Sequence, residues 1–283
     1  VSDTYEFKAY ANNSLVSKQT VTVGSNSVTL AQTSSSTHPF TGTSLADITY
    51  INRIDQPPVF MSNGGSNFAT LTNWPSGYRA ESIRAYGDFL IALNTTEGGN
   101  NFPSRVRFST PALANNVPST WNENDTTASA GFNDLVQMKT GIVDGMTLGT
   151  KFIVYSKDQV WLMEFVGGSF IFNFRKLFTD CGLINQNCVV EVDGKHYAFG
   201  AFDIYVHDGT SKQSICDERV RTFIYNGLNN TAKERFFVQH NPTLNEIYFC
   251  YLSGDNLVSF PNATRCNRAA VYNYRNNTWS FMD

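Results

Sequence analysis

Short runs of alternating apolar and polar residues, separated by turn residues, recur along the whole chain. The stretch from Cys188 to Ile215 is the clearest case. It predicts four strands, at Val189–Val192, Lys195–Phe199, Ile204–Val206 and Ser211–Ile215. Asp-Gly steps join the first two and the last two runs, and Asp-Gly accepts the positive φ of tight hairpin turns. The stretch therefore predicts a four-stranded antiparallel meander, whose open edges need similar sheets beside it.

Comparable groups of strands repeat from Ala46 onward, about every 40 to 50 residues. The other groups are expected at Ile48–Trp74, Glu81–Trp121, Leu135–Phe178 and Glu234–Phe281. Three groups end at a tryptophan, which suggests an equivalent packing position in each sheet; these residues are Trp74, Trp121 and Trp279. Self-similar units of this size favour an all-β fold, a β-propeller of four-stranded antiparallel sheets, over a Greek-key sandwich. A closed ring of such units could borrow a strand from the N-terminal region.

Residues 1–47 differ from the repeats. Alternating patterns predict strands at Thr4–Tyr10, Leu15–Gly24 and Ser27–Gln32, and Gln32–Ser44 has the composition of a polar linker. We therefore divide the chain into a small N-terminal β element with its linker, residues 1–47, and a β-propeller domain, residues 48–283. One helix is expected within Cys216–Arg235, where apolar residues follow a helical spacing.

Composition and charge exclude some functions. Of the 283 residues 41% are hydrophobic and 16% charged, and the net charge is −3, which disfavours a general binder of nucleic acids or anionic membranes. No apolar run approaches the roughly 18 residues of a membrane span. The five cysteines form no Cys-x-x-Cys pair, so mostly reduced thiols are expected rather than a disulfide framework or a zinc site.

The polar residues form no recognisable catalytic, cofactor-binding or metal-binding motif. His38, His196, His207 and His240 are far apart in sequence; His196 is interpreted as a surface strand residue, and His207 lies beside a turn. An arginine cluster could hold an acidic sugar, but a solvated or interfacial strand face is the simpler interpretation; the cluster is Arg79, Arg84, Arg105 and Arg107. Four aspartates are interpreted as turn formers: Asp125, Asp134, Asp144 and Asp158. We expect no enzyme activity, no catalytic residues, no cofactor and no metal.

Several strand phrases carry a family resemblance. They include RAYGDFLIALN, RVRFSTPA followed by PSTW, KFIVYSKDQVWLMEF, VDGKHYAFGAFDIYVHDG and AAVYNYRNNTWS. Over about Ser82–Asp283 the chain resembles the tail nozzle proteins, also called tail hub or packaged-DNA stabilisation proteins, of short-tailed bacteriophages. The motifs are strand patterns rather than catalytic signatures.

The resemblance implies a non-enzymatic virion protein located in the tail. It implies a propeller on a nozzle subunit that assembles as a ring, usually a hexamer, below the portal and adaptor proteins. Packaged double-stranded DNA would be retained by this conduit and released through its lumen during ejection, without membrane insertion. Two alternatives stay open at this point. One is a carbohydrate-binding or carbohydrate-cleaving propeller, such as a receptor-binding tail protein, and the other is a propeller interaction module of cellular origin.

Overall fold

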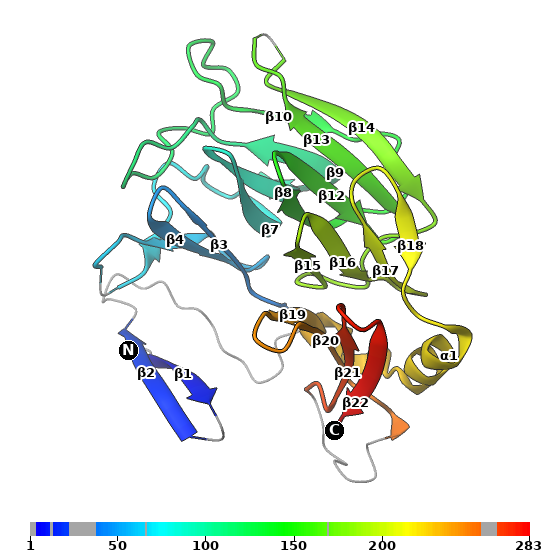
Figure 1. The fold of residues 1–283 in the computed structure, drawn as a ribbon. Coiled ribbons are helices and arrows are strands. Elements are labelled where there is room, and N and C mark those ends of the chain that lie inside the picture. The colour runs from blue at the N-terminus through cyan, green and yellow to red at the C-terminus, as the bar shows by residue number, and fades with distance from the viewer. Residues whose placement is uncertain (1–3, 12–13, 23–37, 66, 169, 256–264) are drawn as a thin grey trace.

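Five four-stranded antiparallel sheets make up a β-propeller in this computed structural model, which describes residues 4–11, 14–22, 38–65, 67–168, 170–255 and 265–283. The sheets are arranged around a common axis (Figure 1). The first sheet contains β3 (Thr41–Leu45), β4 (Ile48–Asn52), β5 (Val59–Met61) and β6 (Ala69–Thr70), and the second contains β7 (Arg79–Tyr86), β8 (Phe89–Glu97), β9 (Asn100–Phe108) and β10 (Gly131–Asp134). The third sheet contains β11 (Ile142–Leu148), β12 (Lys151–Ser156), β13 (Gln159–Phe165) and β14 (Phe172–Thr179), and the fourth contains β15 (Val189–Val192), β16 (Lys195–Phe199), β17 (Ile204–His207) and β18 (Lys212–Ser214). The fifth sheet contains β19 (Phe237–Asn241), β20 (Glu246–Tyr251), β21 (Arg268–Asn273) and β22 (Thr278–Met282).

Each sheet is built from consecutive strands, and its first strand lies closest to the axis. These inner strands pack against one another in the order β3, β7, β11, β15 and β19. β3 lies within the N-terminal region 1–47 and opens the first sheet, so the expectation that the ring takes a strand from this region is confirmed, while no described strand is exchanged between sheets. Side chains, rather than a shared sheet, therefore hold the sheets together.

The core is divided among the spaces between neighbouring sheets. One apolar cluster joins the first and second sheets around Tyr50 and Trp121, and another joins the second and third around Phe152. The largest cluster extends over the last three sheets, with Phe199 and Phe249 wholly buried at its centre. Apolar burial therefore stabilises the four junctions from the first sheet to the fifth.

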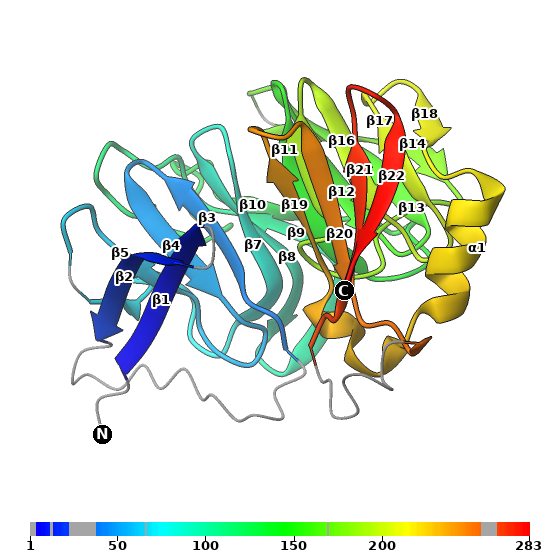
Figure 2. The same cartoon turned by 60° about the horizontal axis from the view of Figure 1, so that its bottom comes forward.

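The expected helix is present between the fourth and fifth sheets. α1 (Glu218–Gly227) begins after Asp217, whose side chain accepts a hydrogen bond from the backbone N–H of Val220, as a helix N-cap does. Ile224 is buried, and η1 (Asn230–Arg235), a 3₁₀ helix, leads into β19. In Figure 2 the helix lies on the outer side of the propeller. No described helix has the length and apolarity to cross a lipid bilayer.

The expected N-terminal β element is represented by an antiparallel hairpin of β1 (Thr4–Ala11) and β2 (Ser14–Thr22). The third strand expected there, Ser27–Gln32, lies outside the described residues. The expected boundary at residue 48 is displaced, because β3 begins at Thr41 and pairs with β4 to open the first sheet. The polar composition of Gln32–Ser44 concealed this strand, since the Thr and Ser of β3 are also good strand residues when one face is exposed.

The tryptophans do not occupy equivalent positions in the sheets. Trp74 and Trp121 lie in connections and touch each other, with ring centroids 4.8 Å apart in an edge-to-face arrangement. Trp279 is instead on β22, the outer strand of the fifth sheet, where its Nε1–H donates to the Ile215 carbonyl. The tryptophan repeat predicted from sequence is therefore wrong, although the strand repeat around it is real.

Candidate functional site

A buried carboxylate lies at the centre of the propeller. Asp144 on β11 is fully buried at a β-bulge in its sheet. It accepts hydrogen bonds from the Ser82 hydroxyl at 2.9 Å and from Arg84 Nε and Nη2 at 2.8 and 2.5 Å. The backbone N–H of Asn187 donates to its second oxygen at 2.9 Å. Asp144 therefore joins the second, third and fourth sheets, and its interpretation as a turn former is wrong.

The partners of Asp144 extend these connections to the remaining two sheets. Arg84 Nη1 donates to the Gly42 carbonyl of the first sheet at 2.8 Å, and Arg84 Nη2 also donates to Asn187 Oδ1 at 2.9 Å. The Asn187 carbonyl accepts from Val238 N–H of the fifth sheet at 2.8 Å. We call Arg84, Asp144 and Asn187 the axial junction, because together they contact all five sheets and occupy the space between the inner strands.

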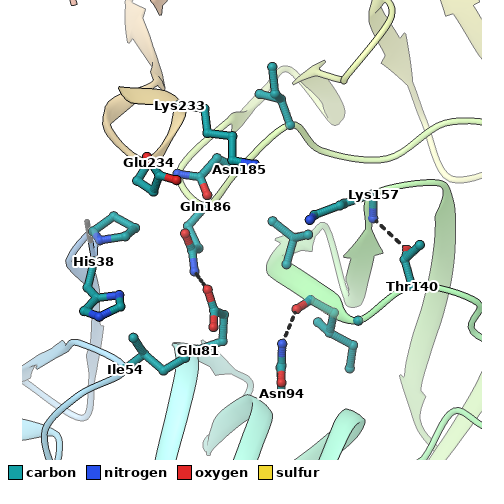
Figure 3. A pocket seen from close by; sticks show the side chains of 15 residues that line it. His38, Ile54, Glu81, Asn94, Thr140, Lys157, Asn185, Gln186, Lys233 and Glu234 are labelled. Atoms are coloured by element: carbon teal, nitrogen blue, oxygen red, sulfur yellow. Dashed lines mark hydrogen bonds between the residues drawn. The ribbon is translucent and has the colours of Figure 1, made fainter. Parts of the chain in front are cut away.

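A cavity of about 450 Å³ opens at one end of the axis. We call it the axial pocket, and Figure 3 shows its side chains. All five sheets or their flanking connections contribute lining residues: His38, Pro39, Ile54, Glu81, Asn94, Thr140, Gly141, Ile142, Val143, Lys157, Ile184, Asn185, Gln186, Lys233 and Glu234. This size lies within the range of cavities that hold small ligands.

Two polar residues at the base of the axial pocket define its electrostatics. Gln186 Nε2 donates a hydrogen bond to the Glu81 carboxylate, and this pair lies between His38 and Lys157 (Figure 3). Burial raises the pKa of the Glu81 carboxyl, because a desolvated carboxylate is disfavoured. Neither residue was recognised from sequence, since the chemistry of Glu81 depends on a partner 105 positions away.

A second polar network joins the third and fourth sheets around Tyr155. His196 and His207 are buried, and the Tyr155 oxygen lies 2.7 Å from His196 Nδ1 and 2.6 Å from His207 Nε2. Gly209 N–H donates to His207 Nδ1, so Nε2 of His207 carries the hydrogen given to Tyr155. Tyr155 then donates to His196 Nδ1. The interpretation of His196 as a surface residue is wrong.

The proton positions make both imidazoles neutral. His196 Nε2 lies 2.8 Å from the Thr147 carbonyl, which can only accept, so each ring carries one hydrogen and every described hydrogen bond is satisfied. Burial lowers the pKa of His196 to about 4, and burial together with the nearby His196 lowers that of His207 to about 3. This arrangement holds two sheets together and offers no exposed acid or base.

These pKa shifts predict acid sensitivity. The unfolded chain binds protons to both histidines near pH 6.5, whereas the folded chain does not, so the free energy of unfolding should fall as the pH decreases from about 6.5 to about 4. We expect a loss of a few kcal/mol over this window, measured by urea unfolding at several pH values. Histidine NMR resonances provide the control: titration of His196 and His207 near pH 6.5 in the folded protein would contradict the assignment.

The two clustered arginines of β9 are buried, so their interpretation as a solvated face is wrong. Arg107 is 0% exposed and Arg105 7%. Arg107 pairs with Glu97 at 2.9 Å and Glu123 at 2.8 Å, while Arg105 pairs with Glu97 and Asp134, both at 2.8 Å. Three carboxylates thus surround two guanidinium groups. No excess positive charge is left there for an acidic sugar.

The other candidate residues are dispersed. Asp125 and Asp158 do form turns, through bonds to Thr127 N–H and the Ser156 hydroxyl. Arg79 donates to the Tyr78 carbonyl, and His240 lies 3.1 Å from the Tyr274 hydroxyl. All five cysteines are free thiols. The described residues contain no group of three or more His, Cys, Asp or Glu placed to hold a metal ion.

Comparisons with solved structures find similar chains at low sequence identity. No family model matches the chain, and no curated protein matches it. Sqt1 from Saccharomyces cerevisiae is similar with 10% identity and a TM-score of 0.49, over 86% of this chain and 61% of that chain. YCF48 from Cyanidioschyzon merolae is similar with 10% identity and a TM-score of 0.35, over 77% and 81% of the two chains. The chain therefore spans less than two thirds of Sqt1.

Proposed function

We propose that this chain is a structural subunit of a bacteriophage tail, of the nozzle type that conducts the genome of short-tailed phages. The observation that carries this proposal is the axial junction, which uses buried charge to connect all five sheets. Such a junction makes the propeller stiff, because no sheet can shift without breaking a hydrogen bond to Asp144 or to one of its partners, Arg84 and Asn187. Stiffness suits a conduit wall. The strand phrases in Ser82–Asp283 that resemble nozzle proteins support the same role.

The surface also suits assembly. Several large apolar side chains are more than half exposed at hairpin tips and connections: Leu113, Val136, Phe165, Val166, Phe170 and Phe202. Three of them, Phe165, Val166 and Phe170, flank the β13–β14 turn. Exposed apolar groups of this kind become buried when copies of a chain pack into a ring.

The genome would pass between subunits rather than through one propeller. Arg84, Asp144 and Asn187 occupy the axis of the single chain, so a lumen has to be formed by the assembled ring. The net charge of −3 favours sliding over tight retention of DNA, since nonspecific binding depends on neutralising phosphates.

Assembly is the property to test. We expect native mass spectrometry of the chain, alone or with its portal-side partners, to show a ring near six copies, and electron microscopy to show a central lumen. Replacing Phe165 and Phe170 with serine should reduce the assembled fraction, while Lys195→Ser, at an exposed polar position of β16 outside the apolar set, serves as the control on another sheet. A chain that stays monomeric at all concentrations and with all tail partners would contradict the proposal.

The alternative, a carbohydrate-binding or carbohydrate-cleaving propeller, has the axial pocket in its favour. The neutralised state of Arg105 and Arg107 counts against an acidic sugar as its ligand. Binding of the isolated monomer on an array of bacterial surface polysaccharides, or turnover of such a polysaccharide, would favour this alternative over the tail subunit.

A further inference from the structure

The axial pocket contains two buried hydrogen-bonding atoms that have no partner among the described residues. Gln186 is 2% exposed; its Nε2 is held by Glu81, which leaves Oε1 as a buried acceptor without a donor. The neighbouring Asn185 presents Nδ2, a buried donor without an acceptor. Leaving such an atom unpaired costs about 1–3 kcal/mol. Most buried polar atoms in folded proteins are paired, so two adjacent orphans in one cavity indicate a ligand that supplies a donor and an acceptor.

The lysines and glutamates of the axial pocket are equal in number and form no ion pairs among the described residues. Lys157 and Lys233 contribute ammonium groups, and Glu81 and Glu234 contribute carboxylates. None of the four forms an ion pair with another described residue, although ion pairs are frequent elsewhere in the described part of the chain. Lys233 lies next to Asn185, and Glu81 next to Gln186 (Figure 3). Charged groups of both signs therefore lie beside the two orphan atoms, since Glu234 is also near Asn185 (Figure 3).

The remaining walls are aliphatic. Ile54, Ile142, Val143 and Ile184 line the cavity, and among its lining residues only His38 has an aromatic ring. A flat platform for stacking a nucleobase is therefore lacking in the described lining. The walls suit a branched aliphatic group, which gains stability from burial against them.

We propose that the axial pocket binds a small zwitterion of the α-amino-acid type, either a free amino acid or a short peptide with both ends charged. Asn185 Nδ2 and the Lys233 ammonium receive the carboxylate, and Gln186 Oε1 and the Glu81 carboxylate receive the ammonium group. The aliphatic walls receive the side chain. This inference goes beyond the structural role proposed above and does not depend on it.

Isothermal titration with defined probes tests this site. L-Leucine represents the free amino acid and glycyl-L-leucine represents the short peptide. The probe that binds more tightly identifies which of these two classes of ligand the pocket takes. N-acetyl-L-leucinamide keeps the aliphatic group but lacks both charges. We expect one zwitterionic probe to bind at least about tenfold more tightly than the capped probe, and to raise the melting temperature of the protein.

Variants locate the binding. Gln186→Leu removes the orphan acceptor, and Lys233→Met removes the ammonium group beside Asn185. Each variant should bind the zwitterionic probe about tenfold more weakly, or worse, than the wild type does. Lys151→Met is the matched control, because Lys151 is a surface lysine of β12 that pairs with Glu164 outside the pocket. Circular dichroism shows whether each variant is folded. If Gln186→Leu does not fold, the binding measured with Lys233→Met alone tests the proposed site.

Three results would overturn the inference. They are the absence of binding by both zwitterions at about 10 mM, equal binding of the capped probe, and unchanged binding in folded Lys233→Met.

Discussion

Asp144→Asn is expected to lower the free energy of unfolding by about 3–5 kcal/mol. The change keeps the size of the side chain and removes its charge. Arg84, whose side chain is only 11% exposed, would then remain buried beside a neutral amide. In the variant, an amide NH2 group replaces one of the two carboxylate oxygens of Asp144. This NH2 group cannot accept a hydrogen bond from Arg84 or from the Asn187 N–H, so at least one of the bonds that connect the sheets is lost. Urea unfolding at neutral pH measures the loss.

Glu164→Gln is the matched control for this experiment. Glu164 pairs with Lys151 at 3.6 Å, and both side chains are more than a third exposed. Exposed pairs contribute little, so this change should stay within about 1 kcal/mol of the wild type. Similar small losses in both variants would show that the axial junction does not hold the sheets together.

Arg107→Met is also expected to lower the free energy of unfolding by about 3–5 kcal/mol. Methionine fills much of the volume of the arginine stem but supplies no donor. Glu97, whose side chain is 7% exposed, loses two hydrogen bonds from Arg107 and keeps only the single one from Arg105 and one from Thr95. Glu123 loses its guanidinium partner as well. The pKa of Glu123, which Arg107 holds below its usual value, should return toward that value.

Arg175→Met provides the comparison, since Arg175 is an exposed strand arginine of β14. The melting temperature and the free energy of unfolding of Arg175→Met, measured by thermal and urea unfolding, should be close to those of the wild type. The second measurement is titration of Glu123 by NMR in wild type and in Arg107→Met. An unchanged pKa of Glu123 together with unchanged stability would contradict the network that the structure shows.

The strand repeat could be predicted from sequence because it depends on local pattern. The segment Cys188–Ile215 combines period-2 alternation with two Asp-Gly steps, and β15 and β16 have the bounds expected from it. The helix after Cys216 was predicted for a similar reason, since its apolar residues follow a helical spacing along the chain. Polar strands were harder, as β3 shows, because Thr and Ser are common in both strands and linkers.

The polar networks could not be predicted because their partners are distant in sequence. Asp144 was interpreted as a turn residue, although its charge is matched by Arg84, 60 positions earlier. His196 alternates with apolar neighbours as a surface residue would, and only the fold places Tyr155 against it. Arg105 and Arg107 were recognised as a pair on one face, but nothing local shows that Glu97, Glu123 and Asp134 surround them. The axial pocket likewise combines residues from five separate parts of the chain.

The construction of each sheet from consecutive strands has an evolutionary consequence. Duplication of one uninterrupted gene segment would create a complete extra blade, and deletion would remove one, without leaving any sheet short of a strand. The bonds that Arg84, Asp144 and Asn187 make across the centre would have to be rebuilt for a wider or narrower ring. The number of blades in this architecture can therefore change in whole steps during descent.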